Sequence, residues 1–110
     1  MPAGMLRHRV TLLQPVHRPG VIGETLTTWS AVAVVWAEIR ELSGREWYEA
    51  QQLPEGDVST DIIIRYRADV TRQMRVVYGS QTYDIVAVLD RDGRKKQLIL
   101  KCREVTAHGG

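Results

Sequence analysis

The stretch that decides the fold is Met74–Val105, MRVVYGSQTYDIVAVLDRDGRKKQLILKCREV. Its runs 74–78, 82–89 and 96–105 are rich in β-branched and aromatic residues and alternate in polarity, which predicts three strands. Gly79-Ser80 suits a two-residue hairpin turn with glycine at the first central position, and Asp92-Gly93 joins the next pair of strands. In the last run Leu98, Leu100 and Cys102 fall on one side. This part of the chain is therefore predicted to be an antiparallel meander with one buried face.

The N-terminal half also favours strands. His8–Gln14 is predicted to be a short strand that Pro15 closes, because proline cannot donate to a strand ladder. Pro15–Glu24 is predicted to be a loop from its proline and glycine content. Thr25–Leu42 is rich in β-branched and aromatic residues and is predicted to be one long strand, and Val58–Arg67 returns to the same alternation.

Residues 43–57 interrupt this pattern. Ser43-Gly44-Arg45-Glu46 fits a capping box, in which the serine hydroxyl and the glutamate carboxylate bind backbone N–H groups at a helix start. The residues after it are good helix formers, and Pro54 with Gly56 ends the run. Such a short segment is marginal alone, so a short helix and an adaptable loop are both allowed. We call residues 43–57 the excursion.

The predicted fold class is mainly β. We expect a small antiparallel β-barrel or sandwich of five to six strands, with one short helix or long loop inserted between the second and third main strands. With 110 residues, 44% of them hydrophobic and 25% charged, the chain has the size and composition of one ordinary domain. Residues 1–110 are therefore predicted to be a single domain, with 106–110 as a flexible tail.

Composition also limits the function. No apolar run approaches the roughly 20 residues that cross a bilayer, and the charged N-terminus does not suit a signal peptide, which predicts a cytosolic origin and no membrane partner. The single Cys102 excludes an intrachain disulfide. The net charge of +2 is too balanced for a histone-like DNA binder.

The sequence offers little chemistry for catalysis. His8, His17 and His108 lack the spacing of a zinc site, and Cys102, on an alternating strand, is expected to be a buried, inert thiol. The carboxylates Asp84, Asp90 and Asp92 could act as an acid–base pair, but turn chemistry explains those beside Gly93 better. No glycine-rich phosphate loop is present. We therefore predict no enzyme activity, no cofactor and no metal.

Arginine and aromatic residues leave two interpretations open. Arg65-Tyr66-Arg67, with Arg72 and Arg75 nearby, could form an OB-like nucleic-acid surface, or the arginines could line a solvated face and pair with acids such as Asp61 or a neighbouring subunit. The large aromatics of the first half could mark subunit contacts or belong to a core that the helix covers; these are Trp29, Trp36, Trp47 and Tyr48.

A set of short motifs extends over nearly the whole chain, from about Leu6 to Glu104. In order they are Leu6–Val10, Pro15-Val16, Gly23, Trp29, Val35–Glu38, Ser43–Glu46, Glu49-Ala50, Ile64–Arg67, Met74–Val76, Tyr83–Ile85 and Leu98–Cys102. None is specific alone. In order and spacing together, the chain resembles the phage head–tail joining family, also called head-closure, stopper or head–tail adaptor proteins.

This resemblance implies a structural virion protein, made in the bacterial host cytoplasm, of a tailed phage or prophage. The implied assembly is a ring, typically a dodecamer, below the portal and adaptor proteins, while the isolated chain can be a monomer. The ring would close the DNA-filled head and meet a tail completion protein, with double-stranded DNA passing through its channel without sequence specificity. The alternative function, an OB-like nucleic-acid-binding module, would use Arg65, Tyr66, Arg67 and Arg75.

Two groups of residues are expected to carry the head-joining function. The excursion corresponds to the channel or gating segment of the family, through Ser43, Gly44, Arg45, Glu46, Trp47, Tyr48, Glu49 and Gln52. Contacts to neighbouring subunits or partners are expected at Trp29, Trp36, Arg65, Arg67 and Arg75.

Overall fold

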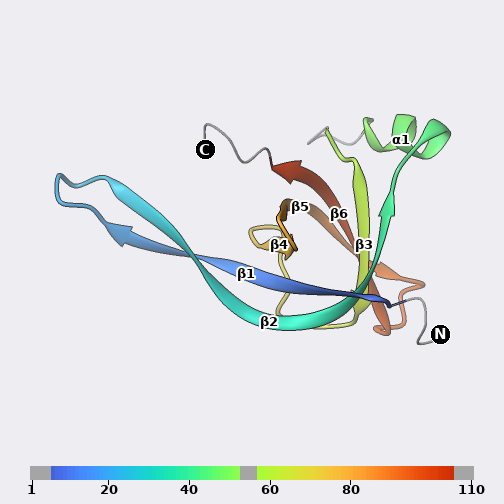
Figure 1. Cartoon of the computed structure of the whole chain (residues 1–110), viewed down its shortest axis with the longest axis horizontal. Helices are drawn as coiled ribbons and strands as arrows, with labels where there is room; N and C mark the ends of the chain where they lie inside the picture. Colours follow the sequence, from blue (N-terminus) through green and yellow to red (C-terminus); the bar gives the residue numbers. More distant parts are fainter. Residues whose placement is uncertain (1–5, 53–56, 106–110) are drawn as a thin grey trace.

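The computed structural model describes residues 6–52 and 57–105. In these ranges the chain forms β1 (His8–Pro19), β2 (Thr25–Glu41), α1 (Gly44–Ala50), β3 (Thr60–Arg65), β4 (Arg75–Tyr78), β5 (Gln81–Arg91) and β6 (Gln97–Val105). The strands are antiparallel and close into a barrel in the order β1-β2-β3-β6-β5-β4 (Figure 1). The mainly β fold with one short helix between β2 and β3 is thus confirmed, and it is a barrel and not a sandwich.

Closure of the barrel depends on β1, which pairs with β2 along its whole length and with β4 from Thr11 to Leu13. Side chains alternate between the interior and the surface, as they do in small barrels. The interior is filled mainly by aliphatic residues, among them Val10, Leu12, Ile62, Ile64, Val76, Ile85, Leu98, Leu100 and Cys102. Each fully buried leucine or isoleucine contributes about 1.5–3 kcal/mol relative to an exposed one.

The C-terminal meander forms as predicted. Tyr78 pairs with Gln81 across Gly79-Ser80, and Gly79 has the positive φ of +60° that this turn requires. The β5–β6 connection is longer, because Arg91 pairs with Gln97. The Asp90 carboxylate accepts the Lys95 backbone N–H at 3.1 Å, so its role is that of a turn residue.

The predicted loop at Pro15–Glu24 is wrong, and so is the strand end at Pro15. β1 continues to Pro19, which pairs with Thr25, and only the residues between them form the turn. The reason is that β4 stops pairing at Leu13, so the chain continues as a two-stranded ribbon in which each strand has an open edge. Proline, which has no N–H to donate, is accepted at such an edge.

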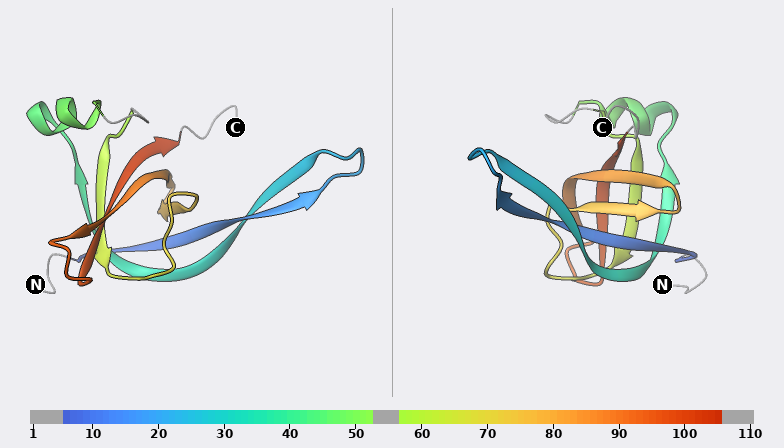
Figure 2. Two further views of the ribbon diagram at one scale, coloured as in Figure 1. Left: turned by 180° about the vertical axis from the view of Figure 1, so that it is seen from behind. Right: turned by 60° about the vertical axis from the view of Figure 1, so that its left-hand side comes forward.

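This ribbon, which we call the arm (residues 13–31), projects from the barrel. It leaves at a register shift in which Leu12 pairs with Ala33 but Leu13 pairs with Ala31, so that Val32 is an extra residue in β2. The molecule is consequently elongated, with extents of 50 × 28 × 26 Å, and Figure 2 shows the arm pointing away from the other strands. From Leu13 to Pro19 the arm extends about 20 Å, six steps at 3.3 Å per residue.

The helix exists, but the predicted capping box does not form. Ser43 has an extended backbone at the N-cap position, and its side chain makes no capping hydrogen bond. Glu46 instead lies 3.1 Å from the Arg40 guanidinium, because β2 ends directly beside the first helical turn. Pro54 and Gly56, expected to end the helix, and the predicted tail 106–110 lie outside the described residues. No helix within the described ranges is long and apolar enough to cross a membrane.

Candidate functional site

Among the described residues, the candidate reactive groups Cys102 and Asp84 are buried or already paired. In the described part of the chain, no three His, Cys, Asp or Glu side chains gather as a metal site would need. Cys102 is fully buried, and burial, aided by the charges of Asp61 and Asp84, raises the pKa of its thiol far above the ordinary value. The Asp84 carboxylate is engaged by Arg75 at 2.7 Å and lies 3.7 Å from Arg103.

A pocket of about 260 Å³ opens at the start of β1, lined by Arg7, His8, Glu38 and Ile39. His8 Nδ1 is 2.9 Å from the Tyr78 hydroxyl, and the two rings meet edge to face. These contacts tie β1 to β4 and give His8 a structural role. His8 is thus held by Tyr78, and the exposed surfaces of the barrel are further candidate functional regions.

The residues expected to contact partners do not form one surface. Trp36 and Arg65 lie on the outer side of the barrel, Trp29 and Arg75 lie at the base of the arm, and Arg67 lies in the loop after β3. The structure thus separates them into three places.

Trp36 is the centre of the first surface. It is 52% exposed and pairs directly with Arg9 of β1, whose guanidinium carbon is 5.4 Å from the ring centre. Ala37 pairs with Ile64 of β3. Trp36 and Arg65 are the next residues along their strands, so they occupy neighbouring positions on the two strands.

Two further strands extend this surface. Arg65 pairs with Gln97 of β6, and Gln97 pairs with Arg91 of β5, whose guanidinium donates to the Gln97 side chain at 3.2 Å. Val34, 54% exposed, adds apolar area beside Trp36. We call Arg9, Val34, Trp36, Arg65 and Arg91 the arginine–tryptophan face. Only Trp36 and Arg65 of this face were predicted from the sequence. The other residues are brought beside them by the pairing of strands, which the sequence pattern does not reveal.

Arg75 has its partners inside the chain. Its guanidinium carbon lies 4.3 Å from the centre of the half-buried Trp29 ring, and its Nε donates to Asp84 Oδ1 at 2.7 Å. Stacking and the ion pair therefore hold the base of the arm against β4. Arg75 and Trp29 position the arm, a role that requires no partner molecule.

Arg67 and Tyr66 are also engaged internally. Arg67 donates two hydrogen bonds to Asp69, at 3.1 and 3.0 Å, which lower the pKa of that carboxyl and raise the pKa of the guanidinium. Tyr66 is partly buried against the core. Asp61 pairs with Lys101 at 3.0 Å and not with an arginine. Of the three residues in this cluster, Arg65 is exposed, whereas Tyr66 packs against the core and Arg67 is paired with Asp69.

Helix α1 of the excursion lies at one end of the barrel (Figure 1). Trp47 is 46% and Tyr48 63% exposed, so neither belongs to a core under the helix. The remaining predicted residues of this segment are all exposed: Ser43, Gly44, Arg45, Glu46, Glu49 and Gln52. Arg45 and Glu49 form an ion pair at 3.4 Å along the helix.

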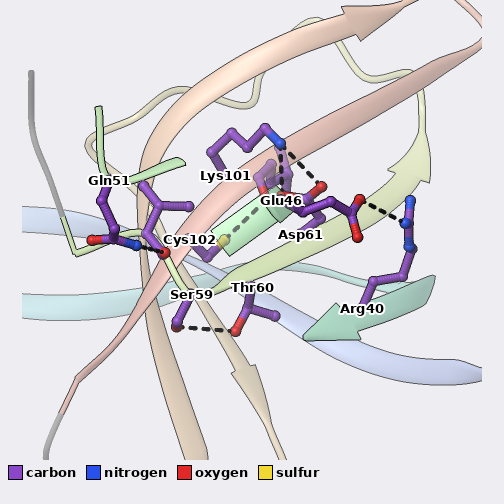
Figure 3. Close-up of polar contacts among 10 residues, drawn as sticks. Arg40, Glu46, Gln51, Ser59, Thr60, Asp61, Lys101 and Cys102 are labelled. Carbon is purple, nitrogen blue, oxygen red and sulfur yellow. Dashed lines mark hydrogen bonds and ion pairs between the residues drawn. The ribbon is translucent and has the colours of Figure 1, made fainter. Parts of the chain in front are cut away.

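Few contacts attach the excursion to the barrel. Ala50 packs with Leu42, Val58 and Val86 in a small cluster separate from the main core. The Gln51 side chain donates to the Val58 carbonyl at 2.6 Å and accepts the Asp57 N–H at 3.0 Å. Figure 3 shows Gln51 on one side and the Arg40–Glu46 pair on the other.

The tip of the arm is a further exposed surface, which the sequence analysis did not identify. Val21 is fully exposed, Ile22 is 86% exposed, and Leu26 is 49% exposed. The turn is closed by the Gly20 N–H, which donates to the Glu24 carbonyl at 2.6 Å, and by the Ile22 N–H, which donates to the Glu24 carboxylate at 3.1 Å. The turn thus places Val21 and Ile22 beside the Glu24 carboxylate, while Leu26 and the exposed Arg18 form a strand pair directly behind it.

Comparison with solved structures shows that this architecture is shared. The solution structure of protein SF1141 from Shigella flexneri 2a is 26% identical, with a TM-score of 0.78, over 97% of this chain and 99% of that chain. A chain from the virion of a native gene transfer agent particle is 22% identical, with a TM-score of 0.63, over 97% of this chain and 100% of that one. This second likeness concerns the fold. No curated protein matches the chain.

The chain matches one protein family over almost its whole length. The model of the phage head completion protein family matches residues 1–105, almost the entire chain. This match confirms the resemblance found in the sequence, and it also confirms the expectation of a structural protein without enzyme activity. The chain belongs to the phage head completion protein family and is a structural component of the virion.

Proposed function

We propose that this protein assembles as a ring below the portal and adaptor proteins, closes the DNA-filled head, and forms part of the DNA channel. The observation that carries the proposal is the excursion: a short helix with outward Trp47 and Tyr48, attached at the end of a closed barrel by a few contacts. Its place in the virion would be the head–tail connector, with a tail completion protein on the other side.

The distribution of exposed apolar groups supports neighbours on several sides. Exposed tryptophan, tyrosine and aliphatic side chains occur on the excursion, on the arginine–tryptophan face and at the arm tip. Soluble monomers rarely expose several such patches, whereas subunits of an assembly bury them in interfaces. The partners that fit are further copies of the chain and the portal, adaptor and tail completion proteins.

The attachment of the excursion supports a gating role. Among its described residues, helix α1 meets the barrel through one small apolar cluster and the Arg40–Glu46 ion pair, and Gln51 binds the neighbouring Val58 carbonyl, while the barrel has its own core. A segment with few buried contacts can change its arrangement while the rest of the domain stays folded. A change in the position of helix α1 would therefore let DNA pass without unfolding the strands.

The modest net charge of +2 suits a conduit. A lining that neutralised many phosphates would hold the DNA tightly, since each such contact adds salt-dependent affinity. A channel for sliding double-stranded DNA needs contacts without sequence specificity and without strong adhesion.

The test replaces the gene, in the phage or prophage that carries it, with a variant in which both Trp47→Ala and Tyr48→Ala are present. Because both side chains are exposed, the variant should fold, and its amount in the particles is measured together with their DNA. We expect particles that lose their nuclease-protected DNA. The control is Arg45→Ala with Glu49→Ala, which alters the same helix without removing its aromatic groups. Full DNA retention by the aromatic variant would refute the gating role, and absence of the wild-type protein from the connector would refute the proposed location.

A further inference from the structure

We propose that the arm tip of one copy docks on the arginine–tryptophan face of the next copy, so that a head-to-tail contact builds the ring. This inference rests on the proposed function, because it supplies the contact between neighbours that a ring needs. It assigns roles to the arm tip and to Arg9 and Arg91, which neither the sequence motifs nor the family match addresses.

The tip is built as a rigid, exposed contact. Val21 and Ile22 extend into solvent, and Glu24 is fixed beside them because its carboxylate accepts the Ile22 N–H. The Glu24 carboxylate lies over Gly20, where an ideal Cβ would overlap it. The arm behind the tip is a continuous antiparallel ladder, and Trp29 stacked on Arg75 holds its base.

The arginine–tryptophan face complements this tip. Its centre is apolar, with Val34 and Trp36 both about half exposed, and it carries the positive charges of Arg9, Arg65 and Arg91. Two aliphatic side chains with a carboxylate fit an apolar centre flanked by guanidinium groups. Tryptophan and arginine are also the residues that most often dominate protein interfaces.

The geometry requires the contact to be between molecules. Tip and face lie on the same β1–β2 hairpin, with Arg9 paired to Trp36 near one end and Pro19 paired to Thr25 near the other. Ten residue steps of strand separate Arg9 from Pro19, about 33 Å at 3.3 Å per residue, so an arm cannot reach its own face. Figure 2 shows the arm directed away from the barrel, where a neighbouring copy would lie.

The symmetry of this contact suits a ring. Two different patches, one on each copy, form a heterologous interface, and such an interface repeats until the rotation closes. A second copy is the favoured occupant over another virion protein because this chain itself presents both complementary halves. Every subunit of a closed ring then has its tip and its face filled.

The test uses cysteine pairs in particles. Two variants, Ile22→Cys at the tip and Arg65→Cys on the face, are co-expressed in place of the wild-type gene, one of them with a mass tag. The native Cys102 has no exposed surface and does not compete. After mild oxidation, we expect a disulfide-linked heterodimer in several-fold excess over the matched pair Ile22→Cys with Ser80→Cys, since Ser80 lies in the exposed β4–β5 turn.

Charge exchange provides a second measurement that does not depend on disulfide geometry. Glu24→Arg should lower incorporation into particles several-fold, and adding Arg65→Glu should restore it. Cysteine variants that enter particles without forming the heterodimer, or that link tip to tip or to another virion protein, would overturn the docking contact alone. Absence of the wild-type chain from particles would overturn the proposed function and this contact with it.

Discussion

The guanidinium of Arg75 stacks on Trp29 with 4.3 Å between its central carbon and the ring centre, and this contact joins β4 to the base of the arm. The same guanidinium is fixed from the other side by Asp84 at 2.7 Å. The arm therefore leaves the barrel in a defined direction, although beyond Leu13 it pairs with no third strand. Arg75, which was expected from the sequence to contact a partner, thus orients the arm.

Removing this stack should loosen the arm without unfolding the barrel. We expect Trp29→Ala and Arg75→Lys each to increase amide hydrogen exchange in Leu13–Pro19, and a double-mutant cycle between them to give a coupling of about 0.5–2 kcal/mol, the range for partly shielded cation–π pairs. The control is Arg9→Lys, at the wider cation–π contact with the exposed Trp36. Unchanged exchange in the arm would contradict the positioning role.

The attachment of the excursion should depend on Gln51. Gln51→Ala removes two hydrogen bonds, to the Val58 carbonyl and from the Asp57 N–H, and should lower the free energy of unfolding by about 1–2 kcal/mol. It should also speed proteolytic cleavage within the excursion. Gln52→Ala is the matched control, because the exposed Gln52 amide reaches only the Tyr48 carbonyl at 3.5 Å. Equal cleavage rates for the two variants would show that Gln51 does not hold the segment.

The core should be far more sensitive than the outer face of the same sheet. Leu100→Ala should lower the free energy of unfolding by about 2–5 kcal/mol, because Leu100 is fully buried and its removal leaves a cavity. Leu89→Ala should cost well under half of that, since Leu89 is 45% exposed on the outer side of β5. Urea denaturation measures both. Similar losses at the two positions would contradict the inward and outward assignment.

The thiol of Cys102 should make the protein less stable at high pH. Its pKa is raised in the folded state, above the ordinary value of 9.0, by burial and by the charges of Asp61 and Asp84. A raised pKa contributes stability that is fully present below the pKa of the unfolded thiol, and that falls as the pH rises above it, because only the unfolded thiol then ionises.

The urea midpoint should therefore fall between pH 8 and pH 10, and Cys102→Ala should reduce this fall. A thiol reagent at pH 8 should modify Cys102 only after unfolding. Rapid modification of the folded protein would contradict the burial of this side chain. It would also remove the basis for using single added cysteines in the cross-linking test.

Much of the fold follows from local sequence patterns. The alternation of Leu98, Leu100 and Cys102 identified the buried face of β6, and Gly79-Ser80 identified the β4–β5 hairpin. For the excursion the sequence allowed a short helix or a loop, and the structure has the helix, with Glu46 paired to Arg40 in place of a capping contact. These features depend on the conformational preferences of neighbouring residues and on the alternation of apolar and polar side chains. Both can be read from a few consecutive residues of the sequence.

The candidate surfaces depend on contacts between distant residues. Pro15 ends a strand by local rules, and only the tertiary structure shows that β1 continues there as an open-edged ribbon. The pairing of Arg9 with Trp36 and the stacking of Arg75 on Trp29 likewise arise from strand register and barrel closure.

The sequence by itself therefore indicated the mainly β fold class, the hairpin meander at its C-terminal end and the family. The tertiary structure decided which arginines stand together, which ones are already paired, and that an arm exists at all. The physical reason is that the alternation along a strand determines which face each side chain occupies. The neighbours of that side chain on the same face depend on how strands far apart in the chain pair with one another.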